Sequence, residues 1–432
     1  MSESTIYALS SGALPSGVAV LRISGSGGKR VLDEIVSSPV KAKHAQLSVL
    51  IDPSSGEKLD QALVLYFPAP SSFTGEDVVE LHCHGGVASV AAVLRTLSEL
   101  QGFRAAEPGE FSRRAFENGK LDLTQLEGLS DIIAANTEEQ RKQALRQTNG
   151  ALRDLYDDWR TRLIRARALI EAELDFADED DVPGSVSDQV WQEVEVLAGS
   201  IRKHLDDQNR GEIVRRGLRI ALMGKPNAGK SSLLNALAKR EIAIVTPQAG
   251  TTRDVLEASL DLEGHFITLF DTAGIRQSDN LVEQEGIKRA RVTGETADMV
   301  LWLHAADDDS DPEPIVDSKI VISKSDLGRS MAAEELHITT QEEDGLSTLL
   351  EWLRQEIKNR TSGGEDVLLT RQRHREALQN TISNLDASLA GTEIEIRSEN
   401  LRLAADHLGR LTGRIDVEDL LDVIFSEFCV GK

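Results

Sequence analysis

The feature that most constrains this chain is a glycine-rich octapeptide, GKPNAGKS, at residues 224–231. It follows the apolar run Leu218–Met223 and opens the helical run Ser231–Leu237. In the pattern G-x-x-x-x-G-K-S, the glycines let backbone N–H groups turn inward around phosphates, and Lys230 supplies a point charge. The spacing places the Ser231 hydroxyl on Mg²⁺. The strand before it and the helix after it favour a phosphate-binding loop over a chance glycine-rich turn.

Two downstream segments extend this nucleotide site. The first is Asp271, Thr272, Ala273 and Gly274, which follow the predicted strand Phe266–Phe270. They suit a carboxylate near the metal and a glycine N–H facing the γ-phosphate. The second runs from Gly250 through Thr251 and Thr252 to Asp254. A threonine here caps Mg²⁺ only when the γ-phosphate is present, which makes the segment a switch. An ordinary Gly-Thr turn is the alternative.

The segment Ser323-Lys324-Ser325-Asp326, after the predicted strand Ile320–Ile322, predicts recognition of guanine. The Asp326 carboxylate accepts hydrogen bonds from guanine N1 and N2. The usual signature is N-K-x-D, so Ser323 removes a side-chain amide that normally braces the loop. Ile275 follows Gly274, so the glutamine that orients water in Ras-like enzymes is missing. We expect GTP as the ligand and another residue as the water positioner.

The first part of the chain predicts an α+β domain over residues 1–118. β-Rich runs at Val18–Ile23, Ala62–Phe67 and Val78–His82 stand between turn-forming residues, and a helical run covers Val87–Leu100. The whole chain has 432 residues, of which 40% are hydrophobic, which is enough for two or three domains.

The remaining patterns predict one domain inserted into another. Helical periodicity covers Asp122–Arg210, interrupted near Asp178–Gly184, and returns over Leu369–Phe428. The second stretch is too short and polar for a core of its own, so we expect one helical-bundle domain over 119–212 plus 364–432. Between its halves, residues 213–363 carry predicted strands and the phosphate loop. The predicted fold is multidomain, with an inserted Ras-like, doubly wound α/β P-loop GTPase domain. Its strand candidates are Leu218–Met223, Leu256–Leu262, Phe266–Phe270, Met299–Leu303 and Ile320–Ile322.

Charge and cysteine content limit the partners and the compartment. Lys and Arg total 48 against 72 Asp and Glu, a net charge of -24, so a polyanion must meet a local basic patch. The two cysteines, Cys83 and Cys429, make no disulfide framework or zinc spacing, which favours a reducing cytoplasm. Residues 1–10 lack a signal pattern, and no apolar run reaches about eighteen residues. We expect a cytoplasmic protein with no membrane span.

Five further segments, in this order and around a P-loop domain, carry a resemblance to a known family. They are LRISG at 21–25, FTGEDVVEL at 73–81 with HGG at 84–86, PGEFS at 108–112, NGKLDL at 118–123 and FCVGK at 428–432. Over nearly its full length the chain resembles the bacterial MnmE (TrmE) family of tRNA-modifying GTPases. The resemblance implies a GTP hydrolase that acts in modification of C5 of the wobble uridine, U34.

The resemblance also implies a tetrahydrofolate site in the N-terminal domain, which would be the dimerisation domain too. Arg22, Glu80 and Lys120 match the family's positions, with Lys432 as a further contact, for 5-formyl- or methylene-tetrahydrofolate. Cations and a carboxylate suit a folate's glutamate and pterin; surface ion pairing is the alternative. Cys429 is a candidate nucleophile or adduct site, with buried packing or an incidental thiol as the alternative.

For catalysis, the resemblance implies that GTPase domains dimerise across K⁺. Asn227 and the carbonyl oxygens of Thr246, Gln248 and Thr251 match the cation-binding positions, where K⁺ would neutralise developing charge. Glu283 matches the family's water-positioning glutamate; a solvated helix face is its alternative. The GTP-binding set implied by motif and resemblance is Asn227, Ala228, Gly229, Lys230, Ser231, Ser232, Thr246, Pro247, Gln248, Ala249, Gly250, Thr251, Thr252, Asp271, Thr272, Ala273, Gly274, Lys324 and Asp326, with Ser231 and Thr252 holding Mg²⁺.

The partners implied by the resemblance are a second copy of the chain, tRNA, and the flavoprotein MnmG, which binds FAD and NADH. The complex with MnmG would be a heterotetramer or larger, and glycine or ammonium would supply the amine. For tRNA, the helical region offers cations that are also compatible with an ordinary solvated helix surface. They are Arg141, Lys142, Arg146, Arg160, Arg162, Arg165 and Arg167.

Two other function classes fit parts of the sequence. A ribosome-assembly GTPase would use the central domain alone, but it predicts an RNA-binding KH module with a GXXG loop, and none is evident after Gly363. A folate-binding scaffold with a degenerate GTPase is suggested by Ser323. Intact Lys230, Ser231 and Asp271, together with Thr252, argue against it.

Overall fold

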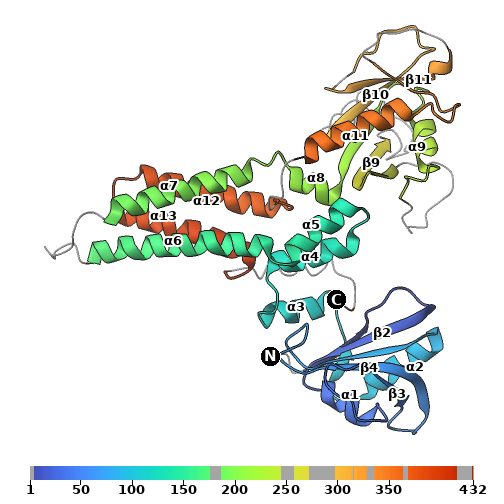
Figure 1. Cartoon of the computed structure of the whole chain (residues 1–432), viewed down its shortest axis with the longest axis vertical. Coiled ribbons are helices and arrows are strands. Elements are labelled where there is room, and N and C mark those ends of the chain that lie inside the picture. Colours follow the sequence, from blue (N-terminus) through green and yellow to red (C-terminus); the bar gives the residue numbers. More distant parts are fainter. Residues whose placement is uncertain are drawn as a thin grey trace, which may run out of the picture. The chain divides into compact units, whose positions relative to one another are not determined.

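The computed structural model describes residues 4–175, 186–244, 257–271, 297–314, 316–327, 335–362, 368–415 and 431 (Figure 1). The chain divides into two units. One comprises Met1–Ser130, Arg153–Arg160 and Leu408–Lys432, and the other comprises Asp131–Leu152 and Thr161–His407.

The first unit is built on a six-stranded sheet in the order β3-β4-β5-β2-β1-β6. Neighbouring strands are antiparallel except for β1 and β6, which are parallel. The strands are β1 Thr5–Leu9, β2 Ser16–Ser24, β3 Gln46–Ile51, β4 Lys58–Phe67, β5 Val78–Gly85 and β6 Phe103–Ala105. The runs predicted from alternating apolar residues lie within β2, β4 and β5, which confirms the α+β assignment.

One face of this sheet is covered by two helices, α1 (Gly28–Glu34) and α2 (Val87–Glu99). The buried side chains of β2 alternate along the strand, as expected for a sheet with one packed face. Leu21 and Ile23 pack with Val31 of α1 and Val93 of α2, all fully buried. The opposite face carries the polar side chains described below.

Helices dominate the segments on both sides of the inserted α/β region. They are α3 Glu110–Glu117, α4 Leu123–Ala134, α5 Glu138–Thr148, α6 Ala151–Asp175, α7 Val186–Leu205, α12 Gln372–Ala390 and α13 Ile394–Thr412. Helices α7 and α12 lie side by side, as Figure 1 shows. An ion pair joins Arg202 to Asp386 across them, and the Arg397 guanidinium of α13 lies 3.5 Å from the Trp191 ring of α7. Segments before and after the α/β region therefore share one bundle, as predicted; the exact domain boundaries stay a prediction.

The inserted α/β region has a second six-stranded sheet, in the order β12-β11-β10-β7-β9-β8. The strands are β7 Leu218–Met223, β8 Glu257–Leu262, β9 His265–Asp271, β10 Met299–Ala305, β11 Lys319–Ser323 and β12 Leu336–His337. All pairs are parallel except β8 with β9. Parallel strands buried on both faces read as continuous apolar runs. This is why β7, with five of its six residues buried, was recognisable from sequence.

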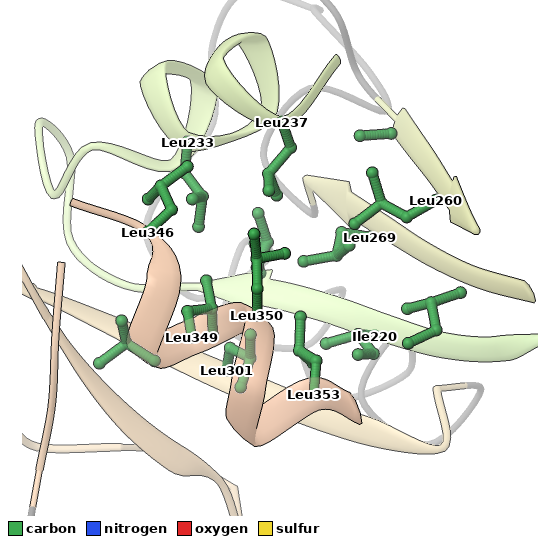
Figure 2. Packing of buried hydrophobic residues seen from close by; sticks show 14 of the residues in the cluster. Ile220, Leu233, Leu237, Leu260, Leu269, Leu301, Leu346, Leu349, Leu350 and Leu353 are labelled. Carbon is green, nitrogen blue, oxygen red and sulfur yellow. The ribbon is translucent and has the colours of Figure 1, made fainter. Parts of the chain in front are cut away.

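A leucine-rich core fixes this sheet against α9 (Lys230–Ala238) and α11 (Ser347–Thr361). Figure 2 shows Leu233 and Leu237 of α9 facing side chains of the sheet and of α11. Leu353 of α11 and Ile220 of β7 are fully buried in the same cluster. Each such side chain contributes about 1.5–3 kcal/mol by leaving water. The core therefore holds the carboxyl ends of β7, β9 and β11, from which the candidate site emerges.

The two remaining short elements are α8 (Arg210–Arg216), which leads into β7, and the 3₁₀ turn η1 (Ser325–Leu327) after β11. In the portion of the chain that the structure describes, none of the helices combines the length and the apolar character needed to cross a bilayer.

Candidate functional site

The phosphate loop has a backbone that only certain residues adopt. Gly224 has φ 140°, Asn227 has φ 64° and Gly229, the N-cap of α9, has φ 88°. Positive φ is readily available to glycine and is tolerated by asparagine. A Cβ on Gly224 would lie 2.2 Å from the carbonyl oxygen of Leu303 in the neighbouring strand. Glycine is thus required at 224 by the close packing of the loop against β10, and it is favoured at 229 by the positive φ.

Lys230 connects the first turn of α9 to the beginning of the loop. Its Nζ donates hydrogen bonds to the carbonyl oxygens of Gly224 at 2.8 Å and Lys225 at 3.0 Å. Burial lowers the pKa of the ammonium, while the nearby Asp271 charge opposes that shift. A partly buried cation held beside inward-turning N–H groups at a helix N-terminus suits a polyphosphate.

Ser231 and Asp271 bring two oxygen atoms together on the same side of the loop. Asp271 ends β9, opposite Leu222 of β7, and is only 5% exposed. Its Oδ2 lies 3.5 Å from the Ser231 Oγ. Hydroxyl and carboxylate oxygens are ligands that Mg²⁺ accepts alongside water and phosphate. The two residues therefore fit the predicted Mg²⁺ position, although no cluster of three or more His, Cys, Asp or Glu side chains suited to a metal occurs in the described residues.

A cavity of about 270 Å³ lies beside the phosphate loop, between α9 and the loop after β11. The Asp326 Oδ1 accepts a hydrogen bond from the Thr339 hydroxyl at 2.8 Å, which orients the carboxylate. Asp326 and Lys324, the residues predicted to recognise the base, both line the cavity. The lining residues are Gly229, Ser232, Leu233, Ser323, Lys324, Asp326, Leu327, Ile338, Thr340 and Gln341.

The sequence predicts that the loop beginning at Ser323 lacks the side-chain contact that an asparagine would make. The structure shows that the serine makes a contact of its own. Its hydroxyl is buried and donates to the Ala228 carbonyl at 2.7 Å, with the His304 carbonyl 3.3 Å away. The base loop is therefore attached to the phosphate loop without an asparagine. The sequence comparison of serine with asparagine missed this because a short side chain suffices where the two backbones approach closely.

Lys324 is held by an acidic neighbour that the sequence motifs did not single out. Its φ is 55°, and its Nζ lies 2.9 and 3.0 Å from the two carboxylate oxygens of Asp307. The hydrogen bond from Lys324 lowers the pKa of Asp307. Thr339, Thr340 and Asp307 are the site neighbours that motif reading missed. The sequence signal for the two threonines is weak: they follow the short segment Leu336-His337-Ile338.

Asn227 is the one predicted K⁺ ligand that the structure describes, and it is exposed. The other predictions in the nucleotide site and tail lie outside the described residues. They are Thr246, Pro247, Gln248, Ala249, Gly250, Thr251, Thr252, Thr272, Ala273, Gly274, Ile275, Glu283, Cys429 and Lys432.

In the first unit, two of the predicted folate residues lie opposite each other on neighbouring strands. Arg22 of β2 pairs in register with Glu80 of β5, and its Nε lies 3.0 Å from the Glu80 Oε1. The guanidinium also lies 5.6 Å from the Phe73 ring centroid and 5.8 Å from that of Phe111. His82 places its Nε2 3.2 Å from the second Glu80 oxygen. A half-buried ion pair flanked by aromatic rings can receive a flat, polar ligand.

Lys120 lies between α3 and α4 and contacts the loop between β4 and β5 that carries Phe73. Its Nζ donates to the Pro70 carbonyl at 2.8 Å, and its stem would lie 3.3 Å from a Cβ at Gly75. Gly431, in the tail, accepts a hydrogen bond from the Ser10 hydroxyl at 2.9 Å at the end of β1. The loop at 70–75 thus links Lys120 to the Arg22 surroundings, and the described tail residue belongs to the same unit.

Several of the proposed tRNA-binding cations are ion-paired within their own helices. Arg141 binds Glu138 at 2.8 Å, Lys142 binds Glu139 at 2.9 Å, and Arg167 binds Glu171 at 2.6 Å. Such exposed pairs are weak and leave the cations available to water. These three pairs are compatible with a solvated helix surface and with contact to tRNA, so the tRNA-binding role of these residues stays a prediction.

Comparison with known proteins gives two family matches that together span nearly the whole chain. Residues 123–429 match the MnmE helical domain, and residues 5–120 match the GTP-binding protein TrmE N-terminus. The chain is 50% identical over 441 residues to the tRNA modification GTPase MnmE of Agrobacterium fabrum, covering 100% of this chain and 99% of that protein. The protein of the same name from Rhizobium etli is 50% identical over 438 residues, covering 100% of both.

Among solved structures, the G domain of the T. maritima FeoB iron transporter is 21% identical, with a TM-score of 0.24. It covers 34% of this chain and 99% of that structure. The fold assignment stands on the strand order and loop geometry described above and not on this distant likeness.

Proposed function

Since the chain belongs to the MnmE family of tRNA modification GTPases, we propose that it hydrolyses GTP at loop 224–231 and uses this cycle in wobble uridine modification. With the flavoprotein MnmG it would add a carboxymethylaminomethyl or aminomethyl group at C5 of U34 of certain tRNAs. The observation that carries the proposal is the convergence of the phosphate loop, the Ser231–Asp271 oxygen pair and the Asp326 pocket on one edge of one sheet.

In this proposal each described residue has one task at the nucleotide. Lys230 and the N–H groups at the start of α9 bind the phosphates, and Asp326 accepts from guanine N1 and N2. Ser231 and Asp271 would hold Mg²⁺, directly or through water, with Thr252 added when the γ-phosphate is present. Mg²⁺, when bound, supplies positive charge to the β- and γ-phosphate oxygens. Burial of the Lys230 ammonium reduces the dielectric screening around it, so its attraction to phosphate is stronger than in water.

The catalytic part of the proposal rests on the family resemblance. A K⁺ ion, bound by Asn227 and the carbonyl oxygens of Thr246, Gln248 and Thr251, would neutralise charge in a dimer of GTPase domains. Glu283 would position the attacking water, since Ile275 cannot. The exposure of Asn227 leaves it accessible to such an ion, which supports this role.

The other proposed roles divide along the chain. Residues 1–118 would bind a tetrahydrofolate derivative and dimerise, 119–212 plus 364–432 would form the helical domain, and 213–363 the GTPase domain. The folate would contact Arg22, Glu80, Lys120 and Lys432, with Cys429 as a candidate thiol. The half-buried Arg22–Glu80 pair beside Phe73 supports that site. We place the homodimer, its tRNA and MnmG in the cytoplasm.

GTP turnover in KCl and NaCl tests the catalytic proposal. Wild-type protein should turn over faster in KCl, and Glu283→Ala should lose most of that activity while still binding GDP. Glu351→Ala, an exposed glutamate on α11, is the matched control and should behave as wild type. Equal rates in the two salts together with an active Glu283→Ala variant would refute the cation-dependent mechanism.

Folate binding is tested separately by calorimetry with 5-formyl-tetrahydrofolate. Arg22→Ala should weaken binding about tenfold or more, because it removes a charge-assisted contact and leaves Glu80 without its cation. Arg30→Ala, which removes an exposed pair with Glu34 in α1 and an exposed hydrogen bond to the Gln101 carbonyl, should leave affinity unchanged. Equal affinities for both variants and wild type would remove Arg22 from the site.

A further inference from the structure

We propose that Ser323 is a positioning residue whose hydroxyl ties the base-recognition loop to the phosphate loop, so that the two halves of the nucleotide are bound by one prearranged body. This inference rests on the nucleotide site proposed above and adds to it a residue outside the predicted binding set. It also assigns guanine selection to Asp326 without help from the side chain that begins the motif.

The tie joins two points that are far apart in the chain and almost completely buried. Ser323, the last residue of β11, is 5% exposed, and Ala228, inside the phosphate loop, is 3% exposed. They are 95 positions apart, and the Ser323 Oγ lies 2.7 Å from the Ala228 carbonyl oxygen. Ala228 stands between Asn227 and Gly229, the two residues with φ near 64° and 88°. The accepting carbonyl therefore belongs to the part of the loop with the least common backbone conformation.

The base-recognition loop, residues 323–326, is held by hydrogen bonds to the segments beside it. The Ser323 carbonyl accepts from the Ala306 N–H at 2.9 Å, and the Ser325 N–H donates to the Ile338 carbonyl at 3.1 Å. Asp326 is fixed by the Thr339 hydroxyl at 2.8 Å. These contacts link the loop to β10 and to the segment after β12. Among the hydrogen bonds of the described residues, the one donated by the Ser323 hydroxyl joins this loop to the phosphate loop.

A serine is suited to this position because the two backbones are close. A Cβ placed on Gly229 would lie 3.5 Å from the Ser323 Oγ and 3.6 Å from its Cβ. A hydroxyl has a single hydrogen to donate, and here it is directed to a backbone carbonyl. Purine N7 is an acceptor present in guanine and adenine alike. With no donor left on Ser323 for N7, discrimination falls to Asp326, which senses the N1 and N2 hydrogens of guanine.

Loss of the hydroxyl should reduce nucleotide affinity through lost preorganisation. The Ala228 carbonyl would be left buried without its partner, and both loops would have to be ordered separately when nucleotide binds. We expect Ser323→Ala to weaken binding of GDP about tenfold, which corresponds to about 1.4 kcal/mol. The preference for GDP over IDP, which lacks the N2 amino group, should also fall, since Asp326 is no longer held in register with the phosphates.

The experiment measures dissociation constants of full-length protein for fluorescent GDP, with unlabelled GDP and IDP as competitors. Ser323→Thr keeps the hydroxyl and should restore affinity and the GDP:IDP ratio to within about threefold of wild type. Ser323→Cys, close in shape but a weak donor, should resemble Ser323→Ala and covers the case in which the alanine variant does not fold.

Two controls make the outcome decisive. Ser388→Ala removes another buried serine hydroxyl bond to a carbonyl, at 2.9 Å from the Arg397 oxygen, far along the chain in α12. It should leave both affinity and the GDP:IDP ratio unchanged. Lys230→Ala should abolish GDP binding; if it does not, the nucleotide site itself is misplaced. If Lys230→Ala abolishes binding while Ser323→Ala and Ser323→Cys keep wild-type affinity and ratio, the proposed tie is overturned alone.

Discussion

Replacing Gly224 by alanine should disrupt the phosphate loop and the strands beside it. The new Cβ would lie 2.2 Å from the Leu303 carbonyl oxygen, about 1 Å closer than ordinary contact, and the clash is with backbone rather than a flexible side chain. The φ of 140° is itself strained for alanine, at about 1–3 kcal/mol. Forcing the strands apart adds about 1–3 kcal/mol. The local destabilisation should therefore be about 2–6 kcal/mol, with loss of GDP binding.

Amide hydrogen exchange read by mass spectrometry suits this test because a multidomain chain does not unfold in one transition. Peptides covering β7 and β10 should exchange faster in Gly224→Ala, while peptides of α12 should not change. The matched control is Gly199→Ala, an exposed position in α7 with nothing within 4 Å of the new Cβ. That variant should gain about 0.5–1 kcal/mol of helix stability. Protected β7 and β10 peptides with normal GDP binding in Gly224→Ala would refute the steric argument.

Three further predictions address the base pocket, the core and the buried thiol. Asp326→Asn replaces a carboxylate acceptor by an amide, so the affinity for GDP should fall about a hundredfold or more in competition assays. The affinity for XDP, which has a carbonyl at C2, should rise. Continued preference for GDP would contradict the assignment. Leu353→Ala should lower local stability by about 2–5 kcal/mol, whereas replacing Val196, which is 63% exposed, by alanine should change it by no more than about 0.5 kcal/mol. Equal amide exchange rates in the two variants would count against the core. Burial raises the pKa of Cys83 from 9.0 to about 12, so the unfolded thiol ionises first and its contribution to stability, intact below pH 9.0, is lost as pH rises toward 12. In a Cys429→Ser background, iodoacetamide should therefore label Cys83 only after unfolding, and rapid labelling of the native protein would show that it is not buried.

The parts of the fold that sequence reasoning found are those with strong local signals. The strand Leu218–Met223 was predicted with its observed bounds, because a run that is apolar except for Arg219 ends at Gly224. Strands β6 and β12, with three and two residues, are too short for periodicity to register. Helix α11 was also missed, although its buried Leu349 and Leu353 follow a helical spacing. The two short strands could not be read from pattern because they exist only by pairing with a neighbouring strand, whereas α11 carried a helical pattern that could have been read.

The candidate site shows the same division. The motif residues Lys230, Ser231 and Asp326 could be predicted because each carries its chemistry in its own side chain. Their supporting contacts could not, because they join distant positions: Thr339 to Asp326 and Ser323 to Ala228. The serine at 323 predicted a missing side-chain contact because serine lacks the amide of asparagine. The short distance between the two backbones, which lets a hydroxyl make the contact, cannot be read from the sequence.

The central claim, that GTP hydrolysis at this loop serves wobble uridine modification, is tested most directly by nucleoside analysis of tRNA. A deletion strain should lose the C5-modified wobble uridine and regain it with the wild-type gene. Complementation with Lys230→Ala should fail, because the phosphate loop can no longer bind the nucleotide. Unchanged modified uridine in the deletion strain, or full rescue by Lys230→Ala, would contradict the account.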